Sequence, residues 1–297
     1  MFEGFQQQTS AVNGIEIAYR KAGSGPALLM LHGHPQTHAM WHKVAPTLAK
    51  HFTVVLPDLR GQGGSSKPGA SERHEAYAKR TMAQDMVSLM QEVAPGPFAV
   101  LAHDRGARVA HRLAMDHPNA VRRMVLLDIA PTLSMYRQTS ETFARAYWHW
   151  FFLIQPSPLP ESLIEAGPEQ YLRSIMAKRS AGMKPFTQEA FDSYIANVSQ
   201  PGVATGICED YRASAGIDLE HDQADVDAGR KMETPLLALW GGQGTVGQCF
   251  DPLAEWRKVA SHVQGQALPS GHYIAEEAPD VLLEHCLPFL KESTPEH

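Results

Sequence analysis

The sequence has little of what membrane, secreted or nucleic-acid-binding proteins depend on. Its only cysteines are Cys208, Cys249 and Cys286, which are far apart and form no CxxC pair. An odd, widely spaced set of cysteines argues against a disulfide framework and favours a reducing compartment. No window approaches the roughly 18 consecutive apolar residues of a membrane helix. The first residues, Met1 to Gln6, do not combine a basic segment with an apolar run, so no secretion signal is expected.

Positive charge is also scarce. The 297 residues include 26 Lys and Arg against 32 Asp and Glu, which gives a net charge of −6. The basic residues are scattered, so neither nucleic acid nor an anionic membrane is expected as a partner. The sequence therefore predicts a soluble, cytoplasmic protein that acts on a small molecule, and it leaves a homodimer open.

Short apolar runs alternate with helical patterns along most of the chain. The runs with strand character are 15–19, 27–31, 52–56, 98–101, 124–127 and 236–240, and the helical patterns are 40–49, 81–93, 105–117 and 280–291. This alternation predicts an α/β protein with a mostly parallel, doubly wound sheet. From about residue 133 to 226 strand signals stop and aromatic residues become frequent. We therefore expect a core of residues 1–132 and 227–297, with an inserted helical cap (lid) at 133–226.

The most informative stretch surrounds Asp104. An apolar run ends just before it, a helical pattern follows it, and the small residues Ala102 and Gly106 lie two positions to either side. Strand, sharp turn and helix in this order are typical of a nucleophile elbow, whose apex residue is usually serine. A carboxylate at the apex is poorly suited to acyl transfer, but it can displace a leaving group from an sp3 carbon. The pattern predicts a hydrolase that forms an alkyl ester on Asp104.

A base and its partner are expected further along the chain. His272 lies on a loop before the last helical pattern, where a general base follows an elbow nucleophile. The strand ending at Trp240 is followed by glycines and a glutamine, and Asp251 precedes a proline as a helix N-cap does. Asp128, at the end of the strand after the elbow helix, remains as the partner of His272, with capping of the lid as its alternative role.

Arg105 and Arg108 lie three residues apart in the first turn of the elbow helix. Cations oppose the dipole at a helix N-terminus, so this pair suggests an anionic substrate held by two guanidiniums. Arg112, one turn later, is expected to be a solvated surface residue.

The histidines near residue 34 permit two interpretations. The loop with His32, Gly33 and His34 follows a strand next to the elbow, where backbone N–H groups of an oxyanion site are expected. His34, His38 and His42 also recur at helical spacing, but no adjacent carboxylate or cysteine completes a metal site. No metal and no cofactor are therefore expected.

Several motifs together resemble the haloacetate (fluoroacetate) dehalogenases of the α/β-hydrolase superfamily. They are HG-x-PQT from His32, MWH-x-VAP from Met40, DLRG from Asp58, HDRG-x-R from His103, LDI-x-PT from Leu127, YWHW from Tyr147, DYRA with Tyr211, DLEHD from Asp218 and SGH from Ser270. The resemblance implies an α/β-hydrolase fold and hydrolysis of haloacetates without a cofactor. It also implies Asp104 as nucleophile, His272 as base and Asp128 as its partner.

The same resemblance assigns binding roles. It places the substrate carboxylate on Arg105 and Arg108, and the leaving halide on His149, Trp150 and Tyr211. From the residues alone these lid aromatics are equally typical of core packing. Three positions depart from the family, which usually has Phe where His34 lies, and Tyr and a polar residue where Gln62 and Gly64 lie.

Two other functions remain open. An epoxide hydrolase also uses an aspartate nucleophile, but it would need lid tyrosines that donate to the epoxide oxygen and no carboxylate clamp. A ligand-binding protein of the same fold would retain binding without turnover. Product formation from fluoroacetate or from styrene oxide separates these alternatives.

Overall fold

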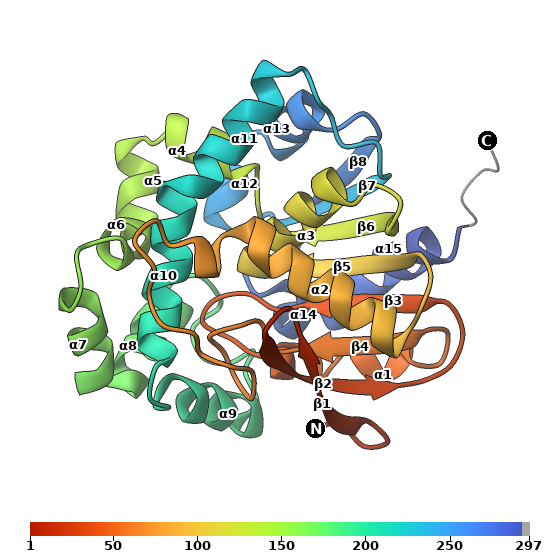
Figure 1. The fold of residues 1–297 in the computed structure, drawn as a ribbon, viewed down its shortest axis with the longest axis horizontal. Helices are drawn as coiled ribbons and strands as arrows, with labels where there is room; N and C mark the ends of the chain where they lie inside the picture. The colour runs from red at the N-terminus through yellow and green to blue at the C-terminus, as the bar shows by residue number, and fades with distance from the viewer. Residues whose placement is uncertain (293–297) are drawn as a thin grey trace.

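The computed structural model describes residues 1–292 and has an eight-stranded sheet at its centre, in the order β1-β2-β4-β3-β5-β6-β7-β8 (Figure 1). The strands are β1 (Gln6–Val12), β2 (Ile15–Ala22), β3 (Ala27–Leu31), β4 (Thr53–Pro57), β5 (Phe98–His103), β6 (Val121–Leu127), β7 (Leu236–Gly241) and β8 (Val263–Leu268). β2 runs antiparallel to β1 and β4, and the other neighbours are parallel. The predicted α/β fold class is confirmed.

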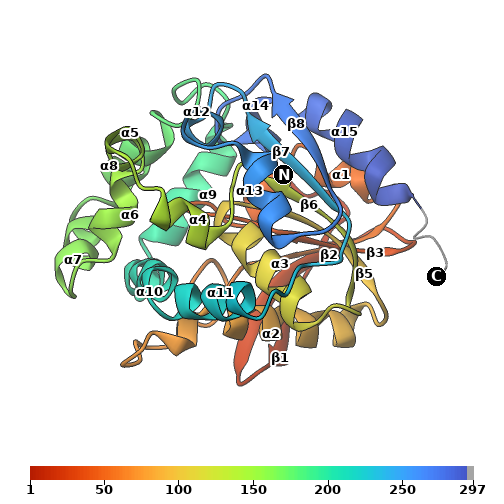
Figure 2. The ribbon, with the colours of Figure 1, turned by 90° about the horizontal axis from the view of Figure 1, so that it is seen from above.

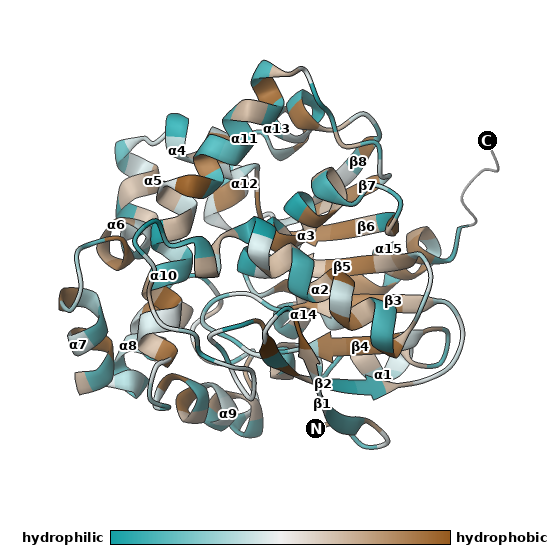
Figure 3. Cartoon of the chain, viewed as in Figure 1, coloured by the Kyte–Doolittle hydropathy of each residue, from teal (hydrophilic) through white to brown (hydrophobic). Residues whose placement is uncertain are grey.

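Helices cover both faces of the sheet (Figure 2). One face carries α1 (Ala45–Leu48), α14 (Ile274–Glu277) and α15 (Pro279–Lys291), and the other carries α2 (Lys79–Val93), α3 (Asp104–Asp116) and α13 (Pro252–Val259). Successive side chains of a strand point to opposite faces, so Val100 belongs to one apolar cluster while Leu101 belongs to the other. The central strands are mostly brown, that is hydrophobic, in Figure 3, and their side chains are buried on both faces of the sheet.

Several elements differ from the prediction, among them β8, which the list of predicted strands does not contain. β1 was not predicted, because its first half is polar and exposed, and its pairing with β2 holds it in place instead. The helix predicted at 40–49 is wrong as one element, since a 3₁₀ turn, η1 (His38–Trp41), precedes the short α1. Pro46 lies in the first turn of α1, where its missing N–H costs nothing, but it prevents a helix from continuing through that point.

The chain between β6 and β7 forms a helical cap, drawn in yellow-green to cyan in Figure 1. Its helices are α4 (Thr132–Arg137), α5 (Glu141–Ala146), α6 (Trp148–Leu153), α7 (Leu159–Ala166), α8 (Pro168–Met176), α9 (Gln188–Val198), α10 (Val203–Ala215) and α11 (Ile217–Asp227). Between residues 128 and 235 the structure has no strand. Within residues 1–292, no helix combines the length and the apolar character needed to cross a bilayer.

Candidate active site

Asp104 lies at a sharp turn between β5 and α3. It is the first residue of α3, is 1% exposed, and has a φ of +47°, in the left-handed region that non-glycine residues rarely adopt. Gly106 lets the helix approach β3, because a Cβ at this position would lie 2.4 Å from the carbonyl oxygen of His32. A positive φ at a non-glycine residue such as Asp104 is strained, and strain of this kind typically marks a functional residue. The geometry is that of a nucleophile elbow.

His272 and Asp128 meet Asp104 at the carboxyl edge of the sheet. Nδ1 of His272 lies 2.5 Å from Oδ2 of Asp128, and Nε2 of His272 lies 3.6 Å from Oδ2 of Asp104. The second oxygen of Asp128 accepts a hydrogen bond from the Gly241 N–H at 2.9 Å. An Nδ1–H that donates to Asp128 leaves Nε2 of His272 as the basic nitrogen. The structure thus brings the three predicted catalytic residues together.

Burial and charge shift the pKa values of this group in useful directions. Burial alone would raise the pKa of Asp104, but the neighbouring guanidiniums of Arg179 and Arg105 contribute positive charge that holds that pKa well below its usual range. Burial, reinforced by Arg179, holds the pKa of His272 well below the ordinary histidine value. Burial raises the pKa of Asp128 to about 7. An ionised Asp104 beside a neutral His272 is the arrangement that a nucleophile and a waiting base require.

His34 faces the nucleophile through its backbone. Its N–H donates to Oδ1 of Asp104 at 3.0 Å, so this amide lies where an oxyanion formed on the Asp104 carboxyl group would be stabilised. Nε2 of the His34 ring forms a 2.9 Å hydrogen bond with the Tyr171 hydroxyl. Burial lowers the pKa of His34 to about 3, so the ring is neutral near pH 7.

Arg105 and Arg108 are both buried, but their environments differ. Arg105 is paired with Asp210, donates to Ser214 Oγ at 2.5 Å, and lies 4.1 Å above the Tyr211 ring. Arg108 donates to Thr132 Oγ1 at 2.8 Å and to the Ala130 carbonyl at 3.3 Å. No carboxylate in residues 1–292 forms an ion pair with Arg108. Nη1 of Arg105 and Nε of Arg108 are buried without a hydrogen-bond partner.

Three polar groups predicted to face the halide are also unsatisfied. Nε2 of His149, Nε1 of Trp150 and the hydroxyl of Tyr211 are buried and have no hydrogen-bond partner within the described part of the chain. The Tyr211 ring centre lies 6.0 Å from that of His149 and 6.3 Å from that of Trp150, and the Arg108 guanidinium lies 4.7 Å above the Trp150 ring. Buried donors normally have partners, so this cluster beside two arginines is suited to an anion.

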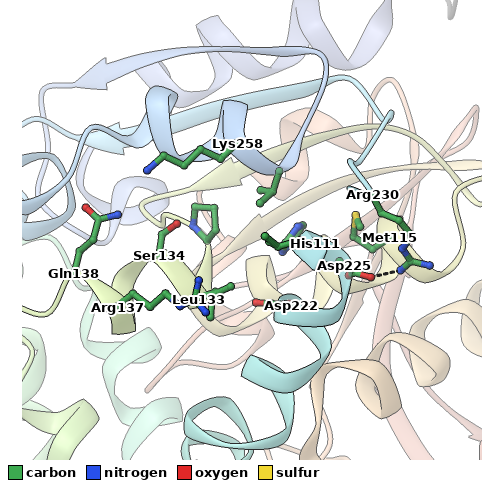
Figure 4. Close-up of a pocket in the computed structure, with 13 residues that line it drawn as sticks. His111, Met115, Leu133, Ser134, Arg137, Gln138, Asp222, Asp225, Arg230 and Lys258 are labelled. Carbon is green, nitrogen blue, oxygen red and sulfur yellow. Dashed lines mark hydrogen bonds and ion pairs between the residues drawn. The ribbon is translucent and has the colours of Figure 1, made fainter. Parts of the chain in front are cut away.

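The candidate site borders a small cavity, and a separate, larger pocket lies elsewhere in the structure. A cavity of about 20 Å³ borders His34, Arg105 and Tyr211. A larger pocket of about 340 Å³ lies between α3, α4, α11 and α13, and it contains none of the predicted site residues (Figure 4). Its carboxylates already have partners, since Asp222 pairs with Arg112, and Asp225 pairs with Arg112 and Arg230.

The motifs interpreted as structural are held by their own contacts. His38 Nδ1 lies 2.8 Å from Asp58 Oδ1, and His42 Nδ1 lies 2.9 Å from the Ala39 carbonyl. Among residues 1–292 no group of His, Cys, Asp and Glu side chains is arranged to hold a metal ion. The Asp251 side chain accepts from the Ala254 N–H as an N-cap, as predicted.

One prediction about α3 is wrong, and one site residue was missed. Arg112 is 2% exposed rather than solvated, because helix α11 packs over it and supplies acidic partners. Arg179, which the sequence did not single out, lies with its Nη2 2.5 Å from Nε2 of His272 and 3.6 Å from Oδ2 of Asp104. It follows α8 in a segment without a motif, so no local pattern indicated its position.

Comparisons with known proteins agree with this geometry. The family model described as the alpha/beta hydrolase fold matches residues 26–279. The chain is 40% identical to a fluoroacetate dehalogenase from Burkholderia sp, covering 99% of this chain and 96% of that protein. It is 33% identical to a soluble epoxide hydrolase from Corynebacterium sp., covering 94% of each. A solved structure of a protein from Nostoc sp PCC 7120 superimposes with a TM-score of 0.96 at 51% identity, covering 99% of this chain and all of that one.

Proposed function

We propose that this chain, which belongs to the alpha/beta hydrolase fold family, is a dehalogenase that hydrolyses haloacetates to glycolate and halide through an ester on Asp104. The observation that carries the proposal is the cluster of unsatisfied buried donors of His149, Trp150 and Tyr211 beside an arginine without a carboxylate partner. A haloacid supplies both missing partners: its carboxylate compensates the charge of the arginine, and its halogen accepts from the three unsatisfied donors.

In the first step the substrate carboxylate binds to Arg105 and Arg108, whose unpartnered nitrogens are Nη1 and Nε. An oxygen of Asp104 then attacks the α-carbon, and the carbon–halogen bond breaks with the electron pair leaving on the halide. Donors from His149, Trp150 and Tyr211 stabilise the charge that develops on the halide. Positioning of this kind can lower a barrier by roughly 7–11 kcal/mol in favourable cases.

In the second step water hydrolyses the ester. Nε2 of His272, held by the Asp128 contact, takes a proton from water as the water oxygen attacks the carboxyl carbon of Asp104. The N–H of His34 stabilises the oxyanion. Collapse releases glycolate and regenerates the Asp104 carboxylate with one oxygen from water, and the net reaction releases one proton. No cofactor takes part in these steps.

The test combines product analysis with isotope labelling. Fluoroacetate, chloroacetate and styrene oxide are offered separately, in water enriched in heavy oxygen, and halide, diol and the mass of the Asp104 peptide are measured. We expect halide from at least chloroacetate, no diol, and label in Asp104. Diol without halide would favour an epoxide hydrolase, the activity named for the relative at 33% identity. Halide release with an unlabelled Asp104 would place the nucleophile elsewhere.

A further inference from the structure

Arg179 belongs to the cap but contacts His272, the candidate general base, which belongs to the core. Its carbonyl oxygen accepts a 2.8 Å hydrogen bond from the N–H of His272. Gly271 makes this approach possible, because a Cβ there would lie 2.6 Å from the same oxygen. The Arg179 side chain is 5% exposed and lies 4.8 Å above the Tyr147 ring. Its guanidinium therefore lies against both the nucleophile and the base.

The charge balance of Arg179 changes during the proposed reaction. Within residues 1–292, Asp104 is the only carboxylate at ion-pair distance from it. When Asp104 becomes an ester its negative charge disappears, and Arg179 is left as a buried cation without a partner, which is costly. The carboxylate of a haloacetate does not replace it, because that group is assigned to Arg105 and Arg108. A second negative group on the substrate would replace the lost charge of Asp104 beside Arg179.

Arg179 also has donors and space for such a group. Its Nε and Nη1 are buried without hydrogen-bond partners. A cavity of about 100 Å³ is lined by Arg179, His272, Tyr147 and Gln243, and by the exposed Lys178. A buried water needs only about 10–15 Å³ of such space, so a carboxylate can enter. The positive charges at this cavity favour an anion.

The same residue restrains the base. Nη2 of Arg179 donates to Nε2 of His272, the nitrogen that must accept a proton from water. While this hydrogen bond persists, the guanidinium occupies the lone pair of His272, so the bond must break before His272 takes a proton from water. A negative group bound in the neighbouring cavity would draw the guanidinium toward itself and release His272.

We propose that Arg179 forms a second anion subsite and that the preferred substrates are short 2-halo dicarboxylates. This inference rests on the proposed function and refines its substrate class. The chemistry is unchanged: a carbon–halogen bond breaks, the halide leaves with the electron pair, water supplies the new hydroxyl group, and one proton is released. The product is a 2-hydroxy dicarboxylate.

The test compares 2-chlorosuccinate with 2-chlorobutanoate, which have equal numbers of carbons and differ by a carboxylate in place of a methyl group. The wild-type protein should show a kcat/KM for halide release about tenfold or more higher with 2-chlorosuccinate. Arg179→Met should abolish this preference, because it should lower kcat/KM for 2-chlorosuccinate by about tenfold or more relative to kcat/KM for 2-chlorobutanoate. Arg145→Met, the same substitution at a cap arginine whose side chain is 78% exposed, should retain the preference.

Equal kcat/KM values in the wild type, or an equal loss on both substrates in Arg179→Met, would overturn the subsite. Calorimetry of the wild type with succinate and with butanoate gives a second measurement that needs neither turnover nor a folded variant. Succinate should bind about tenfold or more tighter, and equal affinities would overturn the subsite. If no haloacid, chloroacetate included, releases halide, the proposed function fails, while the calorimetry still decides the role of Arg179.

Discussion

The two ends of helix α3 carry arginines in opposite situations. Arg112 near its C-terminus contacts three carboxylates, those of Asp116, Asp222 and Asp225, at 2.6 to 3.3 Å. Arg108 near its N-terminus contacts hydroxyl, carbonyl and thioether groups and retains a nitrogen without a partner. Both are buried, so burial does not distinguish them. The difference teaches that an arginine paired with several carboxylates, two of them on α11, holds the cap in place, whereas one with no carboxylate partner and a spare donor is suited to bind a ligand.

The largest effect is expected at the start of α3. Asp104→Asn preserves the shape of the side chain and tolerates the left-handed backbone, but an amide is a very poor nucleophile. Halide release from chloroacetate should fall by about 10⁴-fold or more in kcat. Circular dichroism serves as the control for folding. A folded Asp104→Asn protein that releases halide at the wild-type rate would contradict the assignment.

Substituting the two buried arginines tests the comparison directly. Arg108→Met should raise the KM for chloroacetate by about 10- to 100-fold, because a charge-assisted contact to the substrate is lost. Arg112→Met should leave that KM unchanged and lower the free energy of unfolding by about 3–5 kcal/mol, since it leaves buried carboxylates without their cation. Steady-state kinetics and urea unfolding of both variants provide the measurements. The opposite pattern would show that the spare donors of Arg108 have no binding role.

The smallest effect concerns pH. His272 must be neutral to accept a proton, so activity declines as pH falls through its pKa. Because burial and Arg179 lower that pKa, kcat/KM should hold as pH falls below 6.5, the ordinary histidine value, and decline only under more acidic conditions. Arg179→Met removes a neighbouring cation and should move the decline toward higher pH. Profiles that coincide would indicate that Arg179 does not act on His272.

Local patterns explain which parts of the site could be predicted from the sequence. The elbow at Asp104 is a strand, a turn and a helix in succession, so its signal lies within about ten residues. His272 and Asp128 follow from chain order and from the ends of strands, and the structure brings them to Asp104 as expected.

Arg112 and Arg179 show why the remainder could not be predicted. The surroundings of Arg112 depend on α11, which lies about a hundred residues later in the chain, and helical periodicity cannot indicate which distant helix will cover a side chain. The position of Arg179 depends on a contact between a cap segment and the His272 loop. Neither contact can be predicted from the residues next to Arg112 or Arg179 in the sequence.

The hydrogen bond from the backbone of His272 to the carbonyl of Arg179 has a kinetic consequence. Lifting this part of the cap would break the bond and release the loop that carries the histidine. In the proposed mechanism, ester hydrolysis by His272 would therefore depend on contact between this part of the cap and the His272 loop.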